Sequence, residues 1–367
     1  MKVAIVHDYI KEYGGAERVL EALHEIYPDA PIFTSVYLPS FLGPHKERFD
    51  NFDIRTSFLQ SLPFKSKLIS PIRLIAPLIF PLFDFKNFDV IIVSATGAYS
   101  PNMINKKNAV QICYTHTPPR YLYGYETARD WKKNSVVKFL GLLAIHILRM
   151  IDFKSSEKVD FYIANSEEVK KRIEKFYRKD AKVIYPPVEV KLENLKVKKE
   201  DYFLAGGRIA RAKHTDLIIN TFIKNGLPLK VFGKGFAGFE EEIREKAKGH
   251  ENIEFLGEIN DQRKEVMMKG AKGFIFASQD EDFGITPVES MMVGTPVIAH
   301  RSGGVLETVI EDKTGVFFDN FTVENLNTAI KKFEKIKFDP EKIKSHAEKF
   351  NKERFMKEIK EFIEKHA

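Results

Sequence analysis

The sequence predicts an α/β protein with two domains, each built on a parallel sheet that has helices on both faces. Three observations support this fold class. The chain has 367 residues, which is more than one ordinary core holds and about right for two. Short, continuously apolar runs alternate with helical patterns in both halves, as expected for parallel strands that are buried on both faces. A polar segment at 189–201 separates the halves and is the expected linker.

The first domain is expected at 1–190 and the second at 200–345. Apolar runs in the first domain predict strands at 2–9, 31–37, 88–95, 109–116, 160–166 and 181–187. Runs in the second domain predict strands at 201–207, 229–235, 252–258, 273–278, 295–300 and 315–318. Helical patterns such as 15–27 and 166–177 fall between them. The tail is expected at 346–367, and its run 351–367 has apolar residues at helical spacing, which predicts an amphipathic helix that needs a surface to cover.

The composition limits the compartment and the chemistry. The single cysteine, Cys113, excludes a disulfide framework and a cysteine-based zinc site, and it fits a reducing cytoplasm. The start of the chain does not have the pattern of a signal peptide, because His7 and Asp8 interrupt its apolar run. We therefore expect a cytoplasmic protein, and we expect no nucleic-acid partner.

One stretch of the first domain is both basic and apolar. Residues 51–150 carry 13 basic and 5 acidic side chains, and the stretch 58–85 within them is rich in Leu, Ile and Phe. That combination is typical of a surface that rests on anionic lipid, which would make the protein peripheral at the inner face of a membrane. An ordinary loop-rich part of a core has the same pattern, and both interpretations stay open.

Two glutamates, Glu281 and Glu289, flank the loop that follows the predicted strand 273–278. Thr286 is the expected N-cap of the next helix, since a proline follows it and Glu289 comes three residues later. Gly284 permits close approach of the loop backbone to a ligand. Carboxylates suit sugar hydroxyls, and the free N–H groups of a helix start suit phosphate.

These two acids also have plainer interpretations. A glutamate in the position of Glu289 can serve its own helix alone, and a loop acid such as Glu281 is often only solvated. The Asp280-Glu281-Asp282 triplet has the D-x-D spacing of some metal sites, but one such triplet on a loop is a weak signal.

Three further motifs stand at the ends of predicted strands. Arg208 and Lys213 follow the strand 201–207, where two cations could clamp a diphosphate or simply be solvated. Gly14 and Gly15 open the first helix, which permits close approach of the backbone to a phosphate or sugar. No G-x-G-x-x-G is expected in the right context anywhere in the chain, so a dinucleotide site has little support. His116 ends the strand 109–116, where it could contact a substrate hydroxyl or be structural.

Together these motifs resemble the retaining glycosyltransferases of family 4, which have the GT-B fold. EDFGITPVE (281–289) is similar to the family's paired-glutamate signature, and GGRIARAKH (206–214) is similar to its diphosphate loop. GTPVIAHRSGGVLETV, DKTGVFF and VIYPPVE resemble the segments that usually accompany them. HDYIKEYGGAERVLEAL, IRTSFLQSLPF and CYTHTPPRYLY look closest to the mannosyltransferases of O-antigen and related polysaccharide assembly.

The resemblance implies a role for each candidate residue. The implied catalytic residues are His116, Arg208, Lys213 and Glu281. The implied donor-binding residues are Gly14, Gly15, Arg208, Lys213, Glu281, Phe283, Gly284, Ile285, Thr286 and Glu289. Glu289 would hold the ribose hydroxyls, Glu281 the donor sugar, and the two cations the diphosphate, while Arg120 is a candidate on the acceptor side.

The resemblance also implies the reaction and the architecture. Two Rossmann-like domains would face each other across a cleft, and the tail helix would cross back to the first domain. A hexose, with GDP-mannose the first choice and UDP-sugars open, would move to a saccharide or lipid-linked acceptor by a front-face mechanism with no cofactor and no metal. Another GT-B enzyme, such as a phosphorylase or a sugar-nucleotide epimerase, and a non-catalytic nucleotide-sugar-binding module are the alternatives.

Overall fold

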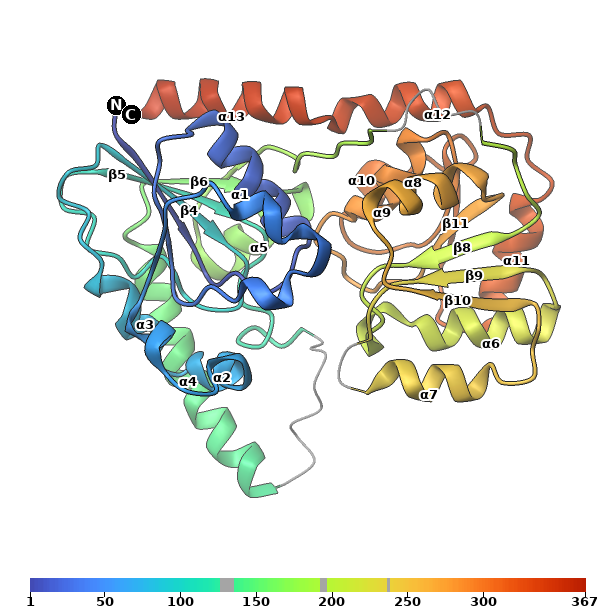
Figure 1. Ribbon diagram of the computed structural model, residues 1–367, viewed down its shortest axis with the longest axis horizontal. Helices are drawn as coiled ribbons and strands as arrows, with labels where there is room; N and C mark the ends of the chain where they lie inside the picture. Colours follow the sequence, from blue (N-terminus) through green and yellow to red (C-terminus); the bar gives the residue numbers. More distant parts are fainter. Residues whose placement is uncertain (126–134, 192–196, 236–237) are drawn as a thin grey trace. The chain divides into compact units, whose positions relative to one another are not determined.

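The computed structural model describes residues 1–125, 135–191, 197–235 and 238–367 (Figure 1). The chain divides into two compact units, and each is described here by itself. Unit 1 contains Met1–Pro187 together with the C-terminal Lys352–Ala367, and unit 2 contains Val188–Asn351. Both units have a parallel sheet with helices on its faces, so the predicted fold class is confirmed.

In the described part of unit 1 the sheet has seven parallel strands in the order β3-β2-β1-β4-β5-β6-β7. Their bounds are Val3–His7 (β1), Ile32–Thr34 (β2), Ile54–Thr56 (β3), Val90–Ala95 (β4), Val110–Thr115 (β5), Phe161–Ala164 (β6) and Lys182–Val183 (β7). The main helices are Gly15–Ile26 (α1), Ser135–Ser156 (α4), Glu167–Tyr177 (α5) and Lys352–His366 (α13). Each predicted run contains a strand, whereas β3 was not predicted because it is a short edge strand without a fully buried residue.

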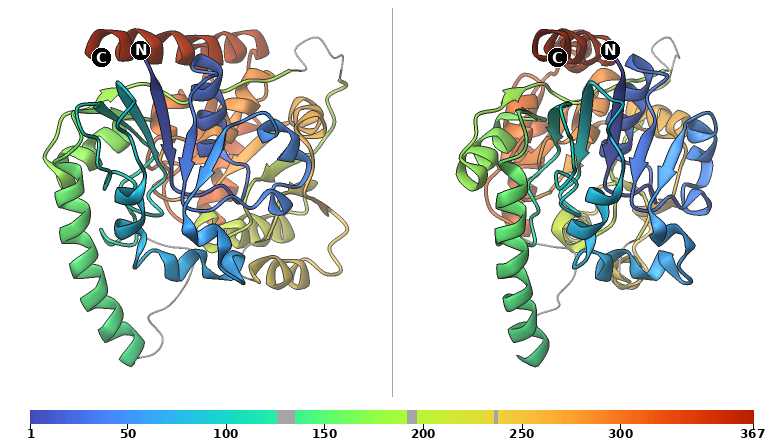
Figure 2. Two further views of the ribbon diagram at one scale, coloured as in Figure 1. Left: turned by 60° about the vertical axis from the view of Figure 1, so that its left-hand side comes forward. Right: turned by 90° about the vertical axis from the view of Figure 1, so that its left-hand side faces the viewer.

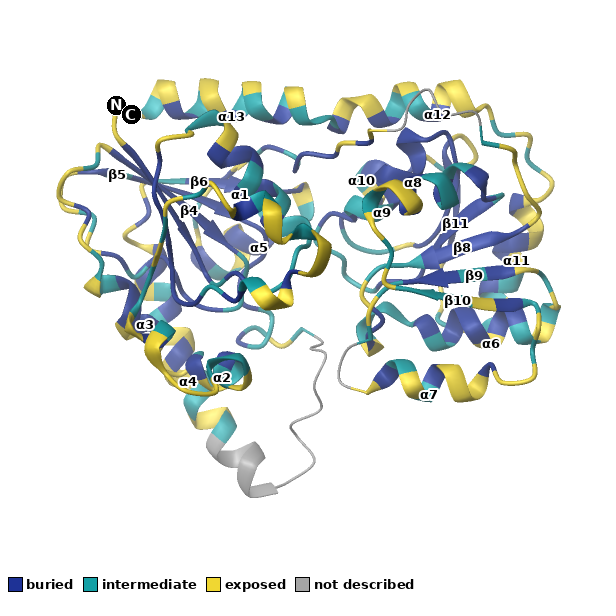
Figure 3. Cartoon of the chain, in the orientation of Figure 1, coloured by how far each residue is buried: buried dark blue, intermediate teal, exposed yellow. Residues whose placement is uncertain are grey.

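The strands are continuously apolar because their alternate residues enter two different cores. Ile5 and Ile92 point to the core that α1 and α13 cover, which includes Leu20 and Phe355. Val6 belongs to the opposite core, which α5 and the segment 58–82 complete. Figure 3 shows the result, with buried strands and helices that are exposed on their outer faces.

The amphipathic run 351–367 forms α13, which begins at Lys352, so the predicted tail helix is confirmed. Residues 346–350, which were grouped with the tail, instead belong to the end of α12 (Pro340–Ala347) and to a 3₁₀ turn at Glu348–Phe350. Phe355, Ile359 and Ile363 of α13 are buried in the core of unit 1.

In the described part of unit 2 the sheet has six parallel strands in the order β10-β9-β8-β11-β12-β13. Their bounds are Phe203–Gly206 (β8), Leu229–Phe232 (β9), Ile253–Gly257 (β10), Gly273–Phe276 (β11), Val297–His300 (β12) and Gly315–Phe318 (β13). The helices are Thr215–Asn225 (α6), Phe239–Lys246 (α7), Asp261–Gly270 (α8), Ile285–Met292 (α9), Val305–Thr308 (α10), Val323–Phe333 (α11) and Pro340–Ala347 (α12). The strand order reverses between β8 and β11, and ligands of open parallel sheets bind at the carboxyl ends of such strands.

The basic, apolar stretch of unit 1 forms short helices, of which Lys65–Ile72 (α2) and Ala76–Ile79 (α3) are α-helical. It is partly core and partly surface. Ile69 and Phe80 are buried, whereas Phe64, Leu78 and Leu82 are about 70% exposed, at 74%, 71% and 70%. In both views of Figure 2 the first turns of α4 extend away from the sheet of unit 1. Within the part of the chain that the structure describes, no helix combines the length and the apolar character needed to span a membrane.

Candidate functional site

The loop between β11 and α9 carries the paired glutamates, and the structure corrects how its helix begins. α9 starts at Ile285, directly after Gly284, so Thr286 lies in the first turn and does not cap it. Gly284 has φ +89, in the left-handed region, which lets the chain enter the helix earlier than predicted. Gly294, with φ +79, follows the last turn and ends the helix. Phe283 is buried in front of the helix.

Glu289 does not complete a capping box but is a buried acid paired with a neighbouring helix. Its Oε1 atom accepts a hydrogen bond of 2.8 Å from Nζ of Lys264 in α8. The same Nζ atom donates to Oδ1 of Asp261 at 3.0 Å. Only 4% of the Glu289 side chain is exposed, so this pair fixes where the carboxylate lies. Lys264 was not predicted, because nothing in the sequence around it distinguishes it from a surface lysine.

Glu281 and Lys213 form an ion pair although 68 residues separate them. The hydroxyl of Ser278 also donates to Oε2 of Glu281 at 2.6 Å. These residues meet because β8 and β11 are adjacent and parallel, so the loops that follow them leave the same edge of the sheet. The structure therefore brings a predicted cation and a predicted carboxylate together at the point where the strand order reverses.

A small hollow lies at the same place. Arg208, Lys213, Ser278 and Gly206 are among the residues that line it. Its volume is about 20 Å³, which holds about one water molecule. Arg208 is exposed, and it lines this hollow together with Lys213, so both predicted cations face the same small volume.

A glycine-rich loop after β12 supports the backbone of the glutamate loop. The N–H of Gly304 donates to the carbonyl oxygen of Glu281 at 2.8 Å. A Cβ atom on Gly303, which has φ +69, would lie 2.3 Å from that same oxygen, so only glycine fits. The hydroxyl of Ser302 accepts a hydrogen bond from the N–H of Asp280 at 3.1 Å. These supporting residues were not singled out as site residues, although a diglycine after a strand is a signal for close approach.

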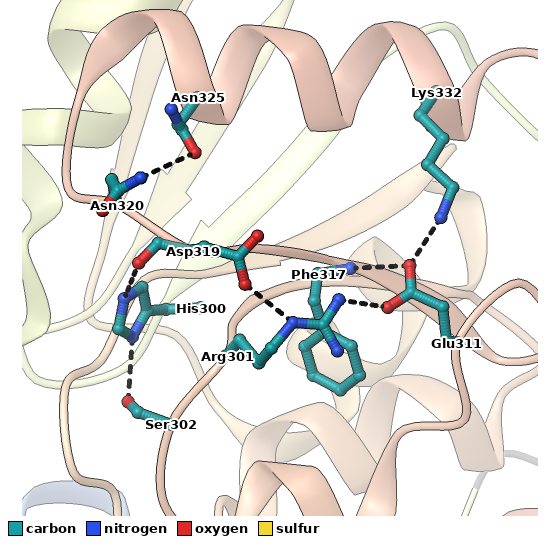
Figure 4. Close-up of polar contacts among 9 residues, drawn as sticks. All are labelled: His300, Arg301, Ser302, Glu311, Phe317, Asp319, Asn320, Asn325 and Lys332. Atoms are coloured by element: carbon teal, nitrogen blue, oxygen red, sulfur yellow. Dashed lines mark hydrogen bonds and ion pairs between the residues drawn. The ribbon is translucent and has the colours of Figure 1, made fainter.

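Figure 4 shows how the loop after β12 is itself anchored. Nδ1 of His300 lies 2.8 Å from the hydroxyl of Ser302. Arg301 donates to Oδ1 of Asp319 at 2.7 Å and to Oε2 of Glu311 at 2.5 Å. Lys332 of α11 donates to the other oxygen of Glu311 at 2.6 Å. The loop that supports Glu281 is thus tied to β13 and α11.

A second glycine loop, after β9, packs against the Arg208 loop. Gly233, Gly235 and Gly238 have the G-x-G-x-x-G spacing between β9 and α7, so the expectation that no such motif stands between a strand and a helix is wrong. A Cβ atom on Gly233 would lie 1.8 Å from the carbonyl oxygen of Gly207. Gly233 is therefore needed for close backbone packing, and its loop lies beside the cation loop.

In unit 1, α1 begins at Gly15 with Gly14 before it, as predicted. The N–H of Gly14 donates to Oε2 of Glu17 at 2.9 Å. His116 follows β5 directly, and its Nε2 atom lies 2.9 Å from the hydroxyl of Ser94. Burial, and secondly the nearby His7, lower the pKa of His116 to about 3. His116 is therefore neutral at physiological pH.

Arg120 lies four residues beyond His116 and is half-buried. Its carbonyl oxygen accepts hydrogen bonds from the N–H groups of Tyr123 and Tyr125, each at 3.2 Å. Its assignment to the acceptor side remains a prediction. Across the described ranges, which omit 126–134, 192–196 and 236–237, no three His, Cys, Asp or Glu side chains form a group that could hold a metal ion.

Two family models match the chain. The model described as Glycosyl transferases group 1 matches residues 189–350, and the model described as Glycosyltransferase Family 4 matches residues 13–192. Among similar curated proteins is an alpha-1,3/1,6-mannosyltransferase ALG2 of Dictyostelium discoideum, 28% identical over 73% of this chain and 71% of that protein. The ALG2 mannosyltransferase of Mus musculus is 24% identical over 87% of this chain and 84% of that protein.

Solved structures share the fold at low identity. A sucrose-phosphate synthase from Thermosynechococcus elongatus has a TM-score of 0.73 and 16% identity, covering 100% of this chain and 99% of that one. Anabaena Alr3699/HepE, in a complex with UDP, has a TM-score of 0.72 and 17% identity, with 100% of both chains covered.

Proposed function

Because the two family models together match residues 13–350, this chain belongs to the group 1, family 4 glycosyltransferases, and we propose that it is a mannosyltransferase. Its donor is proposed to be GDP-mannose, and its acceptor a saccharide, free or lipid-linked. The mannose assignment is supported by the relatives that are named alpha-1,3/1,6-mannosyltransferases. The observation that carries the site assignment is the ion pair of Lys213 with Glu281, where the strand order of unit 2 reverses.

The donor would bind by exchanging partners with this ion pair. Lys213, together with Arg208, would move its positive charge to the diphosphate, which attracts it more strongly than one carboxylate does. Glu281, released from the lysine, would accept hydrogen bonds from two neighbouring sugar hydroxyls. The N–H groups of Ile285 and Thr286 at the start of α9 are available at the same edge of the sheet, where anions are favoured.

Transfer breaks the bond between the anomeric carbon and the diphosphate oxygen, and its electron pair leaves with the diphosphate. Arg208 and Lys213 would stabilise the charge that develops on that oxygen. The acceptor oxygen bonds to the same face of the anomeric carbon, and its proton goes to the departing phosphate oxygen. Configuration is thereby retained. In this proposal two fixed cations perform the charge stabilisation that a metal ion provides in other enzymes.

The first experiment is an assay of the purified chain with GDP-mannose, UDP-glucose and ADP-glucose. Thermal shift identifies the donor, because a ligand of the folded state raises the melting temperature. Release of nucleoside diphosphate with and without a panel of saccharide acceptors then separates transfer from hydrolysis. Acceptor-dependent release from GDP-mannose, in EDTA, is the expected result. Binding without any release would instead indicate a non-catalytic module.

Membrane association is a separate part of the proposal. Residues 58–83 contain three basic residues, Lys65, Lys67 and Arg73, and no acidic residue. Phe64, Leu78 and Leu82 are among the exposed apolar side chains of this segment. Helix α4 exposes further apolar residues. Residues 58–83 and α4 both contact the loop that contains Tyr121 and Leu122, because Arg73 lies over the Tyr121 ring and Arg149 donates to the Leu122 carbonyl oxygen. A basic and apolar surface of this kind suits an anionic bilayer.

Vesicle flotation tests the membrane proposal. The chain is expected to float with vesicles that contain an anionic lipid and less with purely zwitterionic vesicles. The double variant Leu78→Ser/Leu82→Ser should weaken this binding. Leu306→Ser, which changes an exposed leucine of unit 2, is the matched control and should bind as the unchanged protein does. Equal flotation of both variants would exclude this surface.

A further inference from the structure

A row of polar side chains crosses the carboxyl ends of three adjacent strands in unit 1. His7 is the last residue of β1, Ser94 lies near the end of β4, and His116 follows β5. In the sheet His7 is paired with Ser94, and Ser94 with Tyr114. His116 lies two residues after Tyr114 and so faces the same side. All three polar side chains are buried.

Hydrogen bonds join this row into a chain. The hydroxyl oxygen of Ser94 lies 3.1 Å from Nδ1 of His7 and 2.9 Å from Nε2 of His116. The other ring nitrogen of His7, Nε2, is buried without a hydrogen-bond partner and faces Oε1 of Glu17 at 3.8 Å. Oε2 of Glu17 is held by the N–H of Gly14, at the start of α1. A buried carboxylate thus stands at one end and His116 at the other.

The number of protons available sets the direction, from donor to acceptor, of each hydrogen bond in this row. Each neutral imidazole has one donor and one acceptor nitrogen, and the serine hydroxyl has one proton to donate. If His7 carries its proton on Nε2, that N–H points at Glu17, and Nδ1 accepts from Ser94. Ser94 must then accept from Nε2–H of His116, which leaves Nδ1 of His116 as an acceptor.

The opposite direction is unfavourable. It would place the lone pair of His7 Nε2 against the Glu17 carboxylate, so two acceptors would face each other in a buried site. The carboxylate therefore selects the first arrangement.

We infer that Glu17, His7 and Ser94 are positioning residues that hold His116 as the Nε2–H tautomer, so that its Nδ1 atom accepts a hydrogen bond from a hydroxyl group of the bound sugar. This inference rests on the proposed function for its ligand, but the tautomer itself does not. The Nδ1 atom of His116 therefore selects a sugar hydroxyl that donates a hydrogen bond to it, and the ring contributes no positive charge. A sugar whose hydroxyl is replaced by hydrogen or by fluorine cannot make this contact.

The tautomer can be read without any substrate, by ¹⁵N NMR of protein labelled at histidine. The expected spectrum shows His116 neutral and protonated on Nε2 at neutral pH. Glu17→Gln should reverse the direction, because an amide N–H would point at His7 Nε2 and the proton of His116 would move to Nδ1. An unchanged tautomer in that variant, or an Nδ1–H form in the unchanged protein, would overturn the inference even if the enzyme transfers mannose.

Kinetics provide the second readout. Ser94→Ala should lower kcat/KM for the donor about tenfold, the scale of one misplaced hydrogen bond. Thr34→Val is the matched control, since Thr34 is the buried partner of His7 on β2 and its hydroxyl has no hydrogen-bond partner. Deoxy and deoxyfluoro donors should be equally poor at the contacted position. A fluorinated donor that binds clearly better than the deoxy donor would show that His116 donates, and the inference would fail.

Discussion

The sharpest test of the proposed site is Lys213→Ala. The Lys213 side chain is 34% exposed, so its charge acts in a medium between bulk water and protein interior. Two unit charges 4 Å apart interact by about 1 kcal/mol in water and about 4 kcal/mol at the effective dielectric of a protein surface. A value near the middle, about 2.7 kcal/mol, corresponds to a loss of roughly 100-fold in turnover. The variant is expected to lose that much in kcat for mannosyl transfer.

The assay needs a control that removes a neighbouring cation without touching the donor. Arg211 lies on the same loop, but its guanidinium donates to Oε2 of Glu242 at 2.7 Å and lies over the Phe239 ring. Arg211→Ala should therefore keep nearly full turnover, measured as nucleoside diphosphate released per enzyme. If Lys213→Ala and Arg211→Ala lose similar activity, or if Lys213→Ala loses less than about threefold, the electrostatic role of Lys213 is refuted.

Three further predictions follow from supporting residues. Gly303→Ala should weaken donor binding and lower stability by about 1–3 kcal/mol, measured by thermal shift, since its Cβ would collide with the Glu281 backbone. Lys264→Ala should destabilise unit 2 by about 3–5 kcal/mol in denaturant titration, because the charge of Glu289 would stay buried without this partner. The pKa of His116 falls from 6.5 to about 3 on folding. Between these pH values the unfolded chain binds a proton at His116 and the folded chain does not. Stability should therefore decline as pH falls from 6.5 toward 3, and His116→Gln should reduce this decline.

The strands were predictable because each buried strand has a run of apolar residues that is visible in its own sequence. A strand such as β4 fills two cores at once, so its residues Val90 to Val93 form an unbroken apolar run. β3 had no such signal, because Ile54–Thr56 lies at the edge of the sheet and Arg55 is exposed. The start of α9 was misplaced for a different reason: a left-handed glycine opened the helix before the expected threonine cap.

The supporting residues of the site could not be predicted in the same way. Lys213 and Glu281 follow two strands, so the topology of a parallel sheet brings their loops to one edge. Lys264, Ser94 and His7 are common residue types that meet their partners only through folding. A buried serine in a strand has no local signature, and the distance of 87 residues between His7 and Ser94 leaves no trace in the sequence.

The ion pair of Lys213 with Glu281 also gives a physical reason for the proposed donor to carry a diphosphate. A ligand that separates this pair should compensate both partners, since breaking an ion pair in a half-buried site is unfavourable. A nucleoside diphosphate sugar replaces both, because its diphosphate takes the lysine and its hydroxyls take the glutamate. A nucleoside diphosphate alone satisfies only Lys213, and a free sugar satisfies only Glu281. The two fragments should therefore bind cooperatively, and Glu281→Gln should abolish that cooperativity in calorimetry while leaving the affinity for nucleoside diphosphate equal or higher.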